Sequence, residues 1–211
     1  MQWRLLMRRC PMKSLTVVGD IAQASSAAAA SSWEQALEPF VGERFTLDEL
    51  TINYRTPAQI SDAAVAVARS AGYEVSAPRA VRQGDWGPQV HRVPAERVVA
   101  ETVSVVNREV EHSGGALIGV ICPPDEYIAV AQAVGRAHAG RTGTAQDALE
   151  NQVLVLTPWE AKGLEFDVVV IVEPQRLIDD ALGAVGDLYV SMTRPTQRLH
   201  LVGDRMPEGL E

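Results

Sequence analysis

Four polar side chains in this sequence are of the right type to act on a nucleoside triphosphate, and each follows an apolar run. Arg55 and Arg194 could each place a guanidinium on charge that develops on a transferring phosphoryl group. Gln23 lies just after a Gly-Asp turn, where its amide could bind a terminal phosphate oxygen or an attacking water. Glu165 could accept hydrogen bonds from ribose hydroxyls. The four types together suit binding and hydrolysis of a nucleotide.

Each of these segments also has a simpler interpretation when taken alone. Gln23 could be an exposed amide, and Arg55 a surface arginine at the start of a helix, where the helix dipole slightly disfavours a cation. Lys162 could be a solvated charge. The segment Lys-Gly-Leu-Glu-Phe around Gly163 and Glu165 is the most specific of the set, because it lies between two buried apolar runs. There Gly163 would permit close approach of the backbone.

The elements that must position these residues alternate between helix and strand. Two continuous apolar runs, 153–156 and 168–172, indicate strands covered on both faces of a parallel sheet. We therefore predict an α/β fold with a mostly parallel sheet and helices on both faces. The expected strands are 14–18, 45–52, 89–93, 116–122, 153–156, 168–172 and 198–202, and the expected helices are 2–9, 33–40, 57–71, 96–111 and 125–137.

Two prolines define where the arginines stand relative to these helices. Pro57 suits the first turn of a helix, with Thr56 as its cap, so Arg55 would lie just before that helix. Pro195 disfavours helical geometry at Arg194, so a helix should end there. Both arginines are thus predicted at junctions between elements.

Composition limits the class of protein. The 211 residues carry a formal net charge of -8, so the chain by itself does not have the basic surface of a typical nucleic-acid-binding domain. No apolar run is long enough to cross a bilayer, and residues 1–10 do not resemble a signal peptide. Cys10 and Cys122 lack metal-ligand spacing, which favours buried free thiols in a reducing cytoplasm. We expect a cytoplasmic protein with no membrane partner.

The ordered set of motifs resembles the UvrD/Rep group of superfamily 1 helicases. Gly-Asp-Ile-Ala-Gln ending at Gln23 is similar to motif III, and Asn-Tyr-Arg ending at Arg55 to motif IV. Lys-Gly-Leu-Glu-Phe around Glu165 is similar to part of motif V, and Tyr-Val-Ser-Met-Thr-Arg ending at Arg194 to motif VI. The four occur in the family's order and span most of the chain.

The resemblance implies two RecA-like domains with ATP in the cleft between them. Residues 1–42 would be the trailing segment of the first domain, and residues 43–211 would form the second. Gln23, Arg55 and Arg194 would face the γ-phosphate, with Glu165 on the ribose and Gly163 beside the nucleotide. Cleft closure on ATP would then move the protein along a strand of nucleic acid.

Thr157, Trp159 and Trp33 are the candidate nucleic-acid contacts that the resemblance implies. The family usually has histidine where Trp159 stands, and a tryptophan there could stack on a base, pack in a core or bind a protein. The interval between Arg55 and Thr157 has little room for the large insertion that many of these helicases carry. These departures and the acidic charge point toward the HelD branch, whose members act on RNA polymerase. Single-stranded nucleic acid and RNA polymerase are thus both candidate partners.

A complete motor also needs a P-loop and an acidic residue for Mg²⁺, and the sequence shows neither. The stretch 135–142 has suitable glycine spacing but an arginine in place of the required lysine, so we interpret it as a loop. We expect the P-loop and the Mg²⁺ ligands upstream, in a first RecA-like domain, which makes this chain a fragment without ATP turnover of its own. The four histidines, His91, His112, His138 and His200, suggest no metal site.

Overall fold

A six-stranded parallel sheet forms the centre of the computed structural model, which describes residues 2–20, 32–73, 75–147, 150–179 and 184–210. Its strand order is β3-β8-β7-β4-β6-β5, and a separate two-stranded parallel sheet pairs β1 with β2. The strands are β1 (Ile52–Asn53), β2 (Arg79–Ala80), β3 (Gln89–Arg92), β4 (Ile118–Ile121), β5 (Thr142–Gly143), β6 (Val153–Leu156), β7 (Phe166–Val172) and β8 (Pro195–Gly203). The helices are α1 (Gln2–Arg9), α2 (Trp33–Val41), α3 (Ala58–Ser70), α4 (Val98–His112), α5 (Tyr127–Ala137), α6 (Pro174–Asp179) and α7 (Ala184–Met192).

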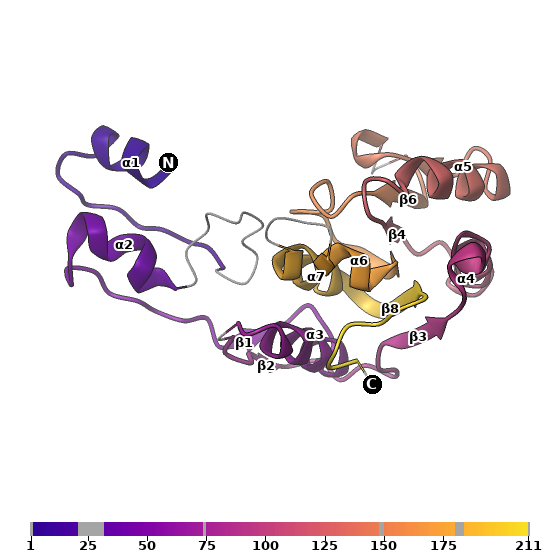
Figure 1. The fold of residues 1–211 in the computed structure, drawn as a ribbon, viewed down its shortest axis with the longest axis horizontal. Coiled ribbons are helices and arrows are strands. Elements are labelled where there is room, and N and C mark those ends of the chain that lie inside the picture. Colours follow the sequence, from indigo (N-terminus) through magenta and orange to yellow (C-terminus); the bar gives the residue numbers. More distant parts are fainter. Residues whose placement is uncertain (1, 21–31, 74, 148–149, 180–183, 211) are drawn as a thin grey trace.

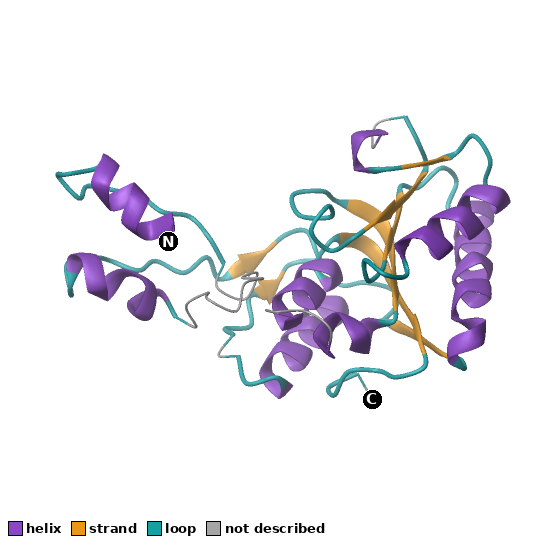
Figure 2. Cartoon of the chain, turned by 45° about the horizontal axis from the view of Figure 1, so that its top comes forward, coloured by secondary structure: helices purple, strands orange, loops and turns teal. Residues whose placement is uncertain are grey.

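Helices cover both faces of the large sheet, as Figure 2 shows. Side chains alternate along β7, so Val168 and Val170 pack with α4 and α5, while Val169 and Ile171 pack with α3, α6 and α7. Both sets are fully buried. This two-sided burial is the reason that the sheet strands are continuous apolar runs. The predicted α/β fold with a parallel sheet and helices on both faces is confirmed.

Most predicted elements match the structure to within two or three residues. Strand 153–156 is reproduced at its exact bounds as β6, and strand 168–172 begins two residues earlier as β7. The stretch 135–142, interpreted as a loop, instead begins in the last turn of α5. Cys122 is buried, and burial raises the pKa of its thiol to about 12, which keeps it protonated and unreactive. Cys10 is only half-buried, so the expectation of two buried thiols is wrong for that residue.

The N-terminal residues form an arm beside the main sheet (Figure 1). Within it, the ring of Trp33 on α2 packs edge-to-face on Trp3 of α1, with ring centroids 6.5 Å apart. The strand predicted at 14–18 is wrong, because this segment is extended but exposed and pairs with no described strand. Val18, for example, is 88% exposed. The strand predicted at 45–52 is reduced to β1, which pairs only with the two-residue β2.

None of the helices in the described ranges combines the length and the apolar character needed to cross a membrane.

A buried polar network fixes α4 to the edge of the sheet. The carboxylate of Glu109 accepts hydrogen bonds from Arg198 Nε at 2.9 Å and pairs with His200 Nε2 at 3.1 Å. His200 Nδ1 in turn lies 3.1 Å from His91 Nε2, and His91 Nδ1 lies 3.6 Å from Glu101. The sequence alone does not show that His91 and His200 meet, because β3 and β8 become neighbours only when the sheet forms.

This network should make the fold less stable in acid. Burial by itself would raise the pKa of Glu109, but the hydrogen bond from His200 and the charge of Arg198 outweigh burial and lower it. A carboxyl with a lowered folded-state pKa contributes stability above its ordinary pKa of 4.5, and that stability is lost as the pH falls through the folded value. Burial lowers the pKa of His91 below 6.5, and the charges of His200 and Arg108 lower it further. The charge of Glu101 acts in the opposite direction.

A neutral histidine of this kind destabilises the fold as the pH falls below 6.5, because the unfolded chain then binds the extra proton. We therefore expect the free energy of unfolding, measured by urea titration, to fall in two steps, near pH 6.5 and again below pH 4.5. Burial also lowers the pKa of His138, so the His91→Gln variant should reduce the first step without removing it and should keep the second. A stability profile that is flat through both windows would show that the network carries no such linkage.

Candidate functional site

A side-chain-capped turn presents Arg55 between β1 and α3. The side-chain oxygen Oδ1 of Asn53 accepts hydrogen bonds from the backbone N–H groups of Arg55 at 3.0 Å and Thr56 at 3.1 Å. This Asx-type turn closes the chain just before the helix and explains why asparagine begins the Asn-Tyr-Arg segment. Thr56 does not cap α3 as predicted. The helix follows Pro57 without a side-chain cap, and the Thr56 hydroxyl lies 3.4 Å from the carbonyl of Thr193.

The guanidinium of Arg55 reaches across to two other segments. Its Nη1 lies 2.6 Å from Oε1 of Glu165, and its Nη2 donates to the carbonyl of Thr193 at 3.3 Å. Its Nε is buried and has no hydrogen-bond partner among the described residues. Arg82 contributes from the other side, since its Nη1 donates to the backbone carbonyl of Arg55 at 3.3 Å. Sequence analysis missed Arg82, which lies outside any recognisable motif.

Arg194 lies beside this pair and is only 5% exposed. Its Nε donates to the carbonyl of Val190 at 3.0 Å, and its two terminal nitrogens lie 3.4 Å from the carbonyl of Leu164 and 3.3 Å from the hydroxyl of Thr193. Burial is the largest cause that lowers the pKa of Arg194, and the charge of Arg55 is the second. The charge of Glu165 raises this pKa. The guanidinium nevertheless stays protonated at any ordinary pH. α7 ends at Met192, so the prediction that a helix ends near Arg194 is confirmed.

The three predicted residues Arg55, Glu165 and Arg194 therefore converge, although 110 residues separate Arg55 from Glu165. They lie at the edge of the sheet where β7 and β8 begin. Glu165 pairs with Arg55 there, and the carboxylates of Glu165 and Asp20 both act electrostatically on Arg194. Because the charge of each arginine disfavours that of the other, an anion bound between them would relieve the repulsion. The arrangement is therefore suited to bind a phosphate group.

The loop from Thr157 to Glu165 joins β6 to β7. Gly163 has a φ of 85°, a backbone conformation in which any residue with a Cβ would be strained, and no atom of the described residues lies within 4 Å of where that Cβ would be. The backbone conformation thus explains why a glycine occupies this position. Lys162 pairs with Asp187 at 3.3 Å, so the interpretation of Lys162 as a simple solvated charge is wrong.

The candidate nucleic-acid contacts do not come together as a group. The side chain of Trp159 is 73% exposed, with the ammonium of Lys162 5.0 Å from the ring centroid. The Thr157 hydroxyl donates a hydrogen bond to Oε2 of Glu160 at 2.8 Å, so this hydroxyl is engaged within its own turn. Trp33 instead packs within the N-terminal arm, against Trp3. Of the three, Trp159 alone presents a large exposed ring to a partner.

Gln23 lies outside the described residues. The neighbouring Asp20 is described, and its carboxylate acts electrostatically on both Arg194 and Tyr189. Tyr189 is buried, and burial, with a smaller effect of Asp20, raises the pKa of its hydroxyl to about 12. Sequence analysis named neither Asp20 nor Tyr189 as a site residue. The Gly-Asp pair of motif III was the signal that could have identified Asp20.

Neither a protein-family model nor a curated protein matches this chain. Among solved structures, the chain is similar to the C-terminal domain of a possible DNA helicase from Lactobacillus plantarum WCFS1. The TM-score is 0.55 at 23% identity, covering 72% of this chain and 87% of that one.

Two further structures superpose less well. The helicase domain of Pyrococcus furiosus Hef has a TM-score of 0.38 at 15% identity, over 50% of this chain and 25% of that one. The Sulfolobus solfataricus SWI2/SNF2 ATPase core in complex with dsDNA has a TM-score of 0.44 at 17% identity, over 77% of this chain and 35% of that one. The first similarity, together with the parallel sheet covered on both faces, shows an α/β RecA-like fold shared with a helicase C-terminal domain.

Proposed function

We propose that this chain is the C-terminal motor domain of an ATP-dependent helicase or translocase of the UvrD-like group. The observation that carries the proposal is the convergence of Arg55 and Arg194 on one site with Glu165 between the segments. In this proposal the two guanidinium groups stabilise charge that develops on the γ-phosphate, and Glu165 binds the ribose hydroxyls. Gly163 allows the loop that carries Glu165 to turn, because its φ of 85° suits glycine.

The chain would provide one wall of an ATP site whose other wall is a first RecA-like domain. That domain would supply the P-loop and the ligands for Mg²⁺, and residues 1–42 would belong to it, with Gln23 facing the γ-phosphate. The electrostatic effect of Asp20 on Arg194 supports this arrangement, because Asp20 would belong to the first domain and Arg194 to the second, on the two sides of the proposed site. Burial of Arg194 in a fixed set of acceptors supports a catalytic role, since a preorganised charge needs little rearrangement.

The proposed partner of the motor is single-stranded nucleic acid, bound in part by stacking on the exposed ring of Trp159. A second candidate is a HelD-like factor that acts on RNA polymerase. It is favoured by the net charge of -8 and by the acidic residues Asp125, Glu126 and Asp204 near the strand ends opposite the arginines. ATP turnover that is stimulated by single-stranded DNA and loses the stimulation in Trp159→Ala would favour the first. Stimulation by RNA polymerase alone would favour the second.

The role of Glu165 provides a test of the proposed nucleotide site. In the protein assembled with its P-loop domain, KM for 2′,3′-dideoxy-ATP should exceed KM for ATP by about tenfold, because a hydrogen bond to a charged group contributes roughly 1.5–3 kcal/mol. The Glu165→Gln variant should reduce this discrimination to about twofold or less. An exposed carboxylate elsewhere, Glu111, serves as the matched control, and Glu111→Gln should discriminate as the wild type does. A Glu165→Gln variant with full discrimination would place the ribose elsewhere.

A further inference from the structure

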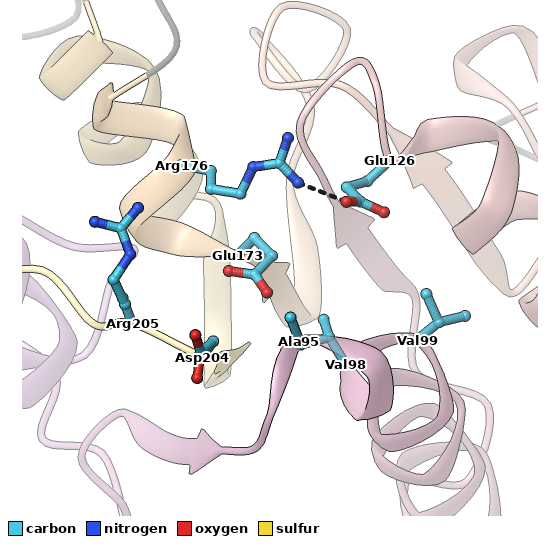
Figure 3. A pocket seen from close by; sticks show the side chains of 8 residues that line it. All are labelled: Ala95, Val98, Val99, Glu126, Glu173, Arg176, Asp204 and Arg205. Atoms are coloured by element: carbon cyan, nitrogen blue, oxygen red, sulfur yellow. Dashed lines mark hydrogen bonds and ion pairs between the residues drawn. The ribbon is translucent and has the colours of Figure 1, made fainter.

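A cavity of about 230 Å³ lies at the opposite edge of the sheet from the arginines, and the proposed motor function does not use it. Glu126, Glu173, Arg176, Asp204 and Arg205 line it together with Ala95, Val98 and Val99 at the start of α4. Figure 3 shows the carboxylate of Glu173 between Asp204 and the ion pair of Arg176 with Glu126.

The topology of the sheet explains why a cavity forms there. β4 continues into α5, which packs on the same face of the sheet as α4. The neighbouring strand β7 continues into α6 and α7, which pack on the opposite face. Two adjacent parallel strands whose connections leave toward opposite faces create a crevice at their carboxyl ends, and ligands of open α/β sheets bind at such switch points. Glu126 follows β4 and Glu173 follows β7, so the cavity occupies this crevice.

Two carboxylates of the cavity, those of Glu173 and Asp204, lie outside the ion pairs of the described residues, although the charge of Arg176 acts on Glu173. Arg176 pairs with Glu126 at 2.5 Å and also with Asp125, and Arg205 pairs with Asp179 at 2.8 Å. Among the described residues, neither Glu173 nor Asp204 makes an ion pair.

Glu173 is 6% exposed and receives a hydrogen bond from the backbone of Asp204. Burial raises the pKa of Glu173, although the hydrogen bond from the Asp204 backbone and the charge of Arg176 act against it, and the charges of Asp204 and Glu126 raise it further. A cation placed beside the two carboxylates would offset this cost.

The volume of the cavity and the side chains that line it indicate which kind of cation could bind there. In the described part of the chain, no group of three histidine, cysteine or acidic residues is arranged to hold a metal ion. The cavity is smaller than the roughly 300–1,000 Å³ of pockets for drug-sized ligands, so a group about the size of one side chain would fit. Val98, Val99 and Ala95 form an apolar wall suited to an alkyl chain. The carboxylates would also repel a nucleic-acid phosphate.

We propose that this cavity binds an alkylguanidinium or alkylammonium group, with the cation against Glu173 and Asp204 and its alkyl chain against Val98 and Val99. A basic side chain of a partner protein and a free small amine share this chemistry. Arg176 acts by holding Glu126 across the crevice, which keeps the cavity open. The site is independent of the nucleotide site, so it stands or falls separately from the proposed motor function.

The test uses the whole chain with n-butylguanidinium chloride and with two capped tripeptides, Gly-Arg-Gly and Gly-citrulline-Gly. Binding is followed by NMR shifts of the Val98 and Val99 methyl groups. We expect a Kd of about 1 mM or tighter for at least one of the two cationic probes, and at least about tenfold weaker binding of the neutral citrulline peptide. Tighter binding of the arginine peptide than of n-butylguanidinium would identify a protein side chain as the source, and the reverse order would identify a free small amine.

The Asp204→Asn and Glu173→Gln variants should each weaken cation binding at least about tenfold, whereas Glu111→Gln should not change it. Asp204 is exposed, so its variant keeps the test valid even where the buried Glu173→Gln variant folds poorly. Binding by neither cation, equal binding of the citrulline peptide, or undiminished binding by Asp204→Asn would each overturn the proposal.

Discussion

The Arg194→Ala variant should lose ATP turnover almost completely, with a fall in kcat of about 10³-fold or more in the protein assembled with its P-loop domain. The physical reason is the fixed position of this guanidinium. Three acceptors, on Val190, Leu164 and Thr193, hold it in a buried site next to Arg55, so its charge is already in place when negative charge develops on the transferring phosphoryl group. Steady-state kinetics should show the loss in kcat while the dissociation constant of the nucleotide changes little.

Two further variants make this result specific. Arg194→Lys keeps the charge, but its single ammonium nitrogen cannot reach the acceptors that three separate guanidinium nitrogens contact, so its kcat should remain at least about tenfold below that of the wild type. Arg136→Ala removes an exposed arginine from the last turn of α5 and should leave turnover unchanged. Because Arg194 is buried, urea denaturation of Arg194→Ala must first show that the variant is folded. A folded Arg194→Ala variant with wild-type kcat would refute the catalytic role.

The Phe166→Ala variant should destabilise the fold by about 3–5 kcal/mol, the usual cost of removing a buried phenylalanine ring. Phe166 is 1% exposed and belongs to the core cluster on the side of α3, α6 and α7. Its ring lies directly over Gly119 on the neighbouring strand β4, where a Cβ would come within 2.8 Å of the ring. The phenylalanine that ends the Lys-Gly-Leu-Glu-Phe segment thus fills a space that the glycine provides. The measurement is the urea midpoint at an unchanged denaturant slope.

A double-mutant cycle with Gly119→Ala tests this contact directly. In the wild-type background Gly119→Ala should cost about 1–3 kcal/mol, because the new methyl group overlaps the ring. In the Phe166→Ala background the same change should cost much less, since the ring is gone. Equal costs in the two backgrounds, or a loss below about 1 kcal/mol for Phe166→Ala alone, would contradict the packing described here.

Strong, continuous apolar runs made most of the sheet predictable from the sequence. β6 and β7 are buried on both faces, so their residues are uniformly apolar and only their ends were uncertain. The motifs also named three residues, Arg55, Glu165 and Arg194, that lie together in the structure. Their contact nevertheless depends on backbone carbonyls, of Thr193 and Leu164, and any residue type could provide those.

The features that the sequence did not predict have a common physical cause, because each depends on a segment that is distant in the sequence. Residues 14–18 have a strand-like sequence but no described partner strand, and an unpaired strand does not form a ladder. His91 and His200 are 109 residues apart and meet only because β3 pairs with β8. The crevice between Glu126 and Glu173 likewise depends on the order of the strands and not on any local motif.

The central claim is that this chain supplies one wall of an ATP site and that a P-loop domain supplies the other. ATP turnover of the chain alone, of the proposed P-loop domain alone, and of the two together tests it most directly. We predict no turnover by the chain alone, little by the P-loop domain alone, and a stimulation of about 10³-fold when both are present, which Arg55→Ala and Arg194→Ala in this chain abolish. Turnover by this chain alone, or a P-loop domain that the chain does not stimulate, would contradict the claim.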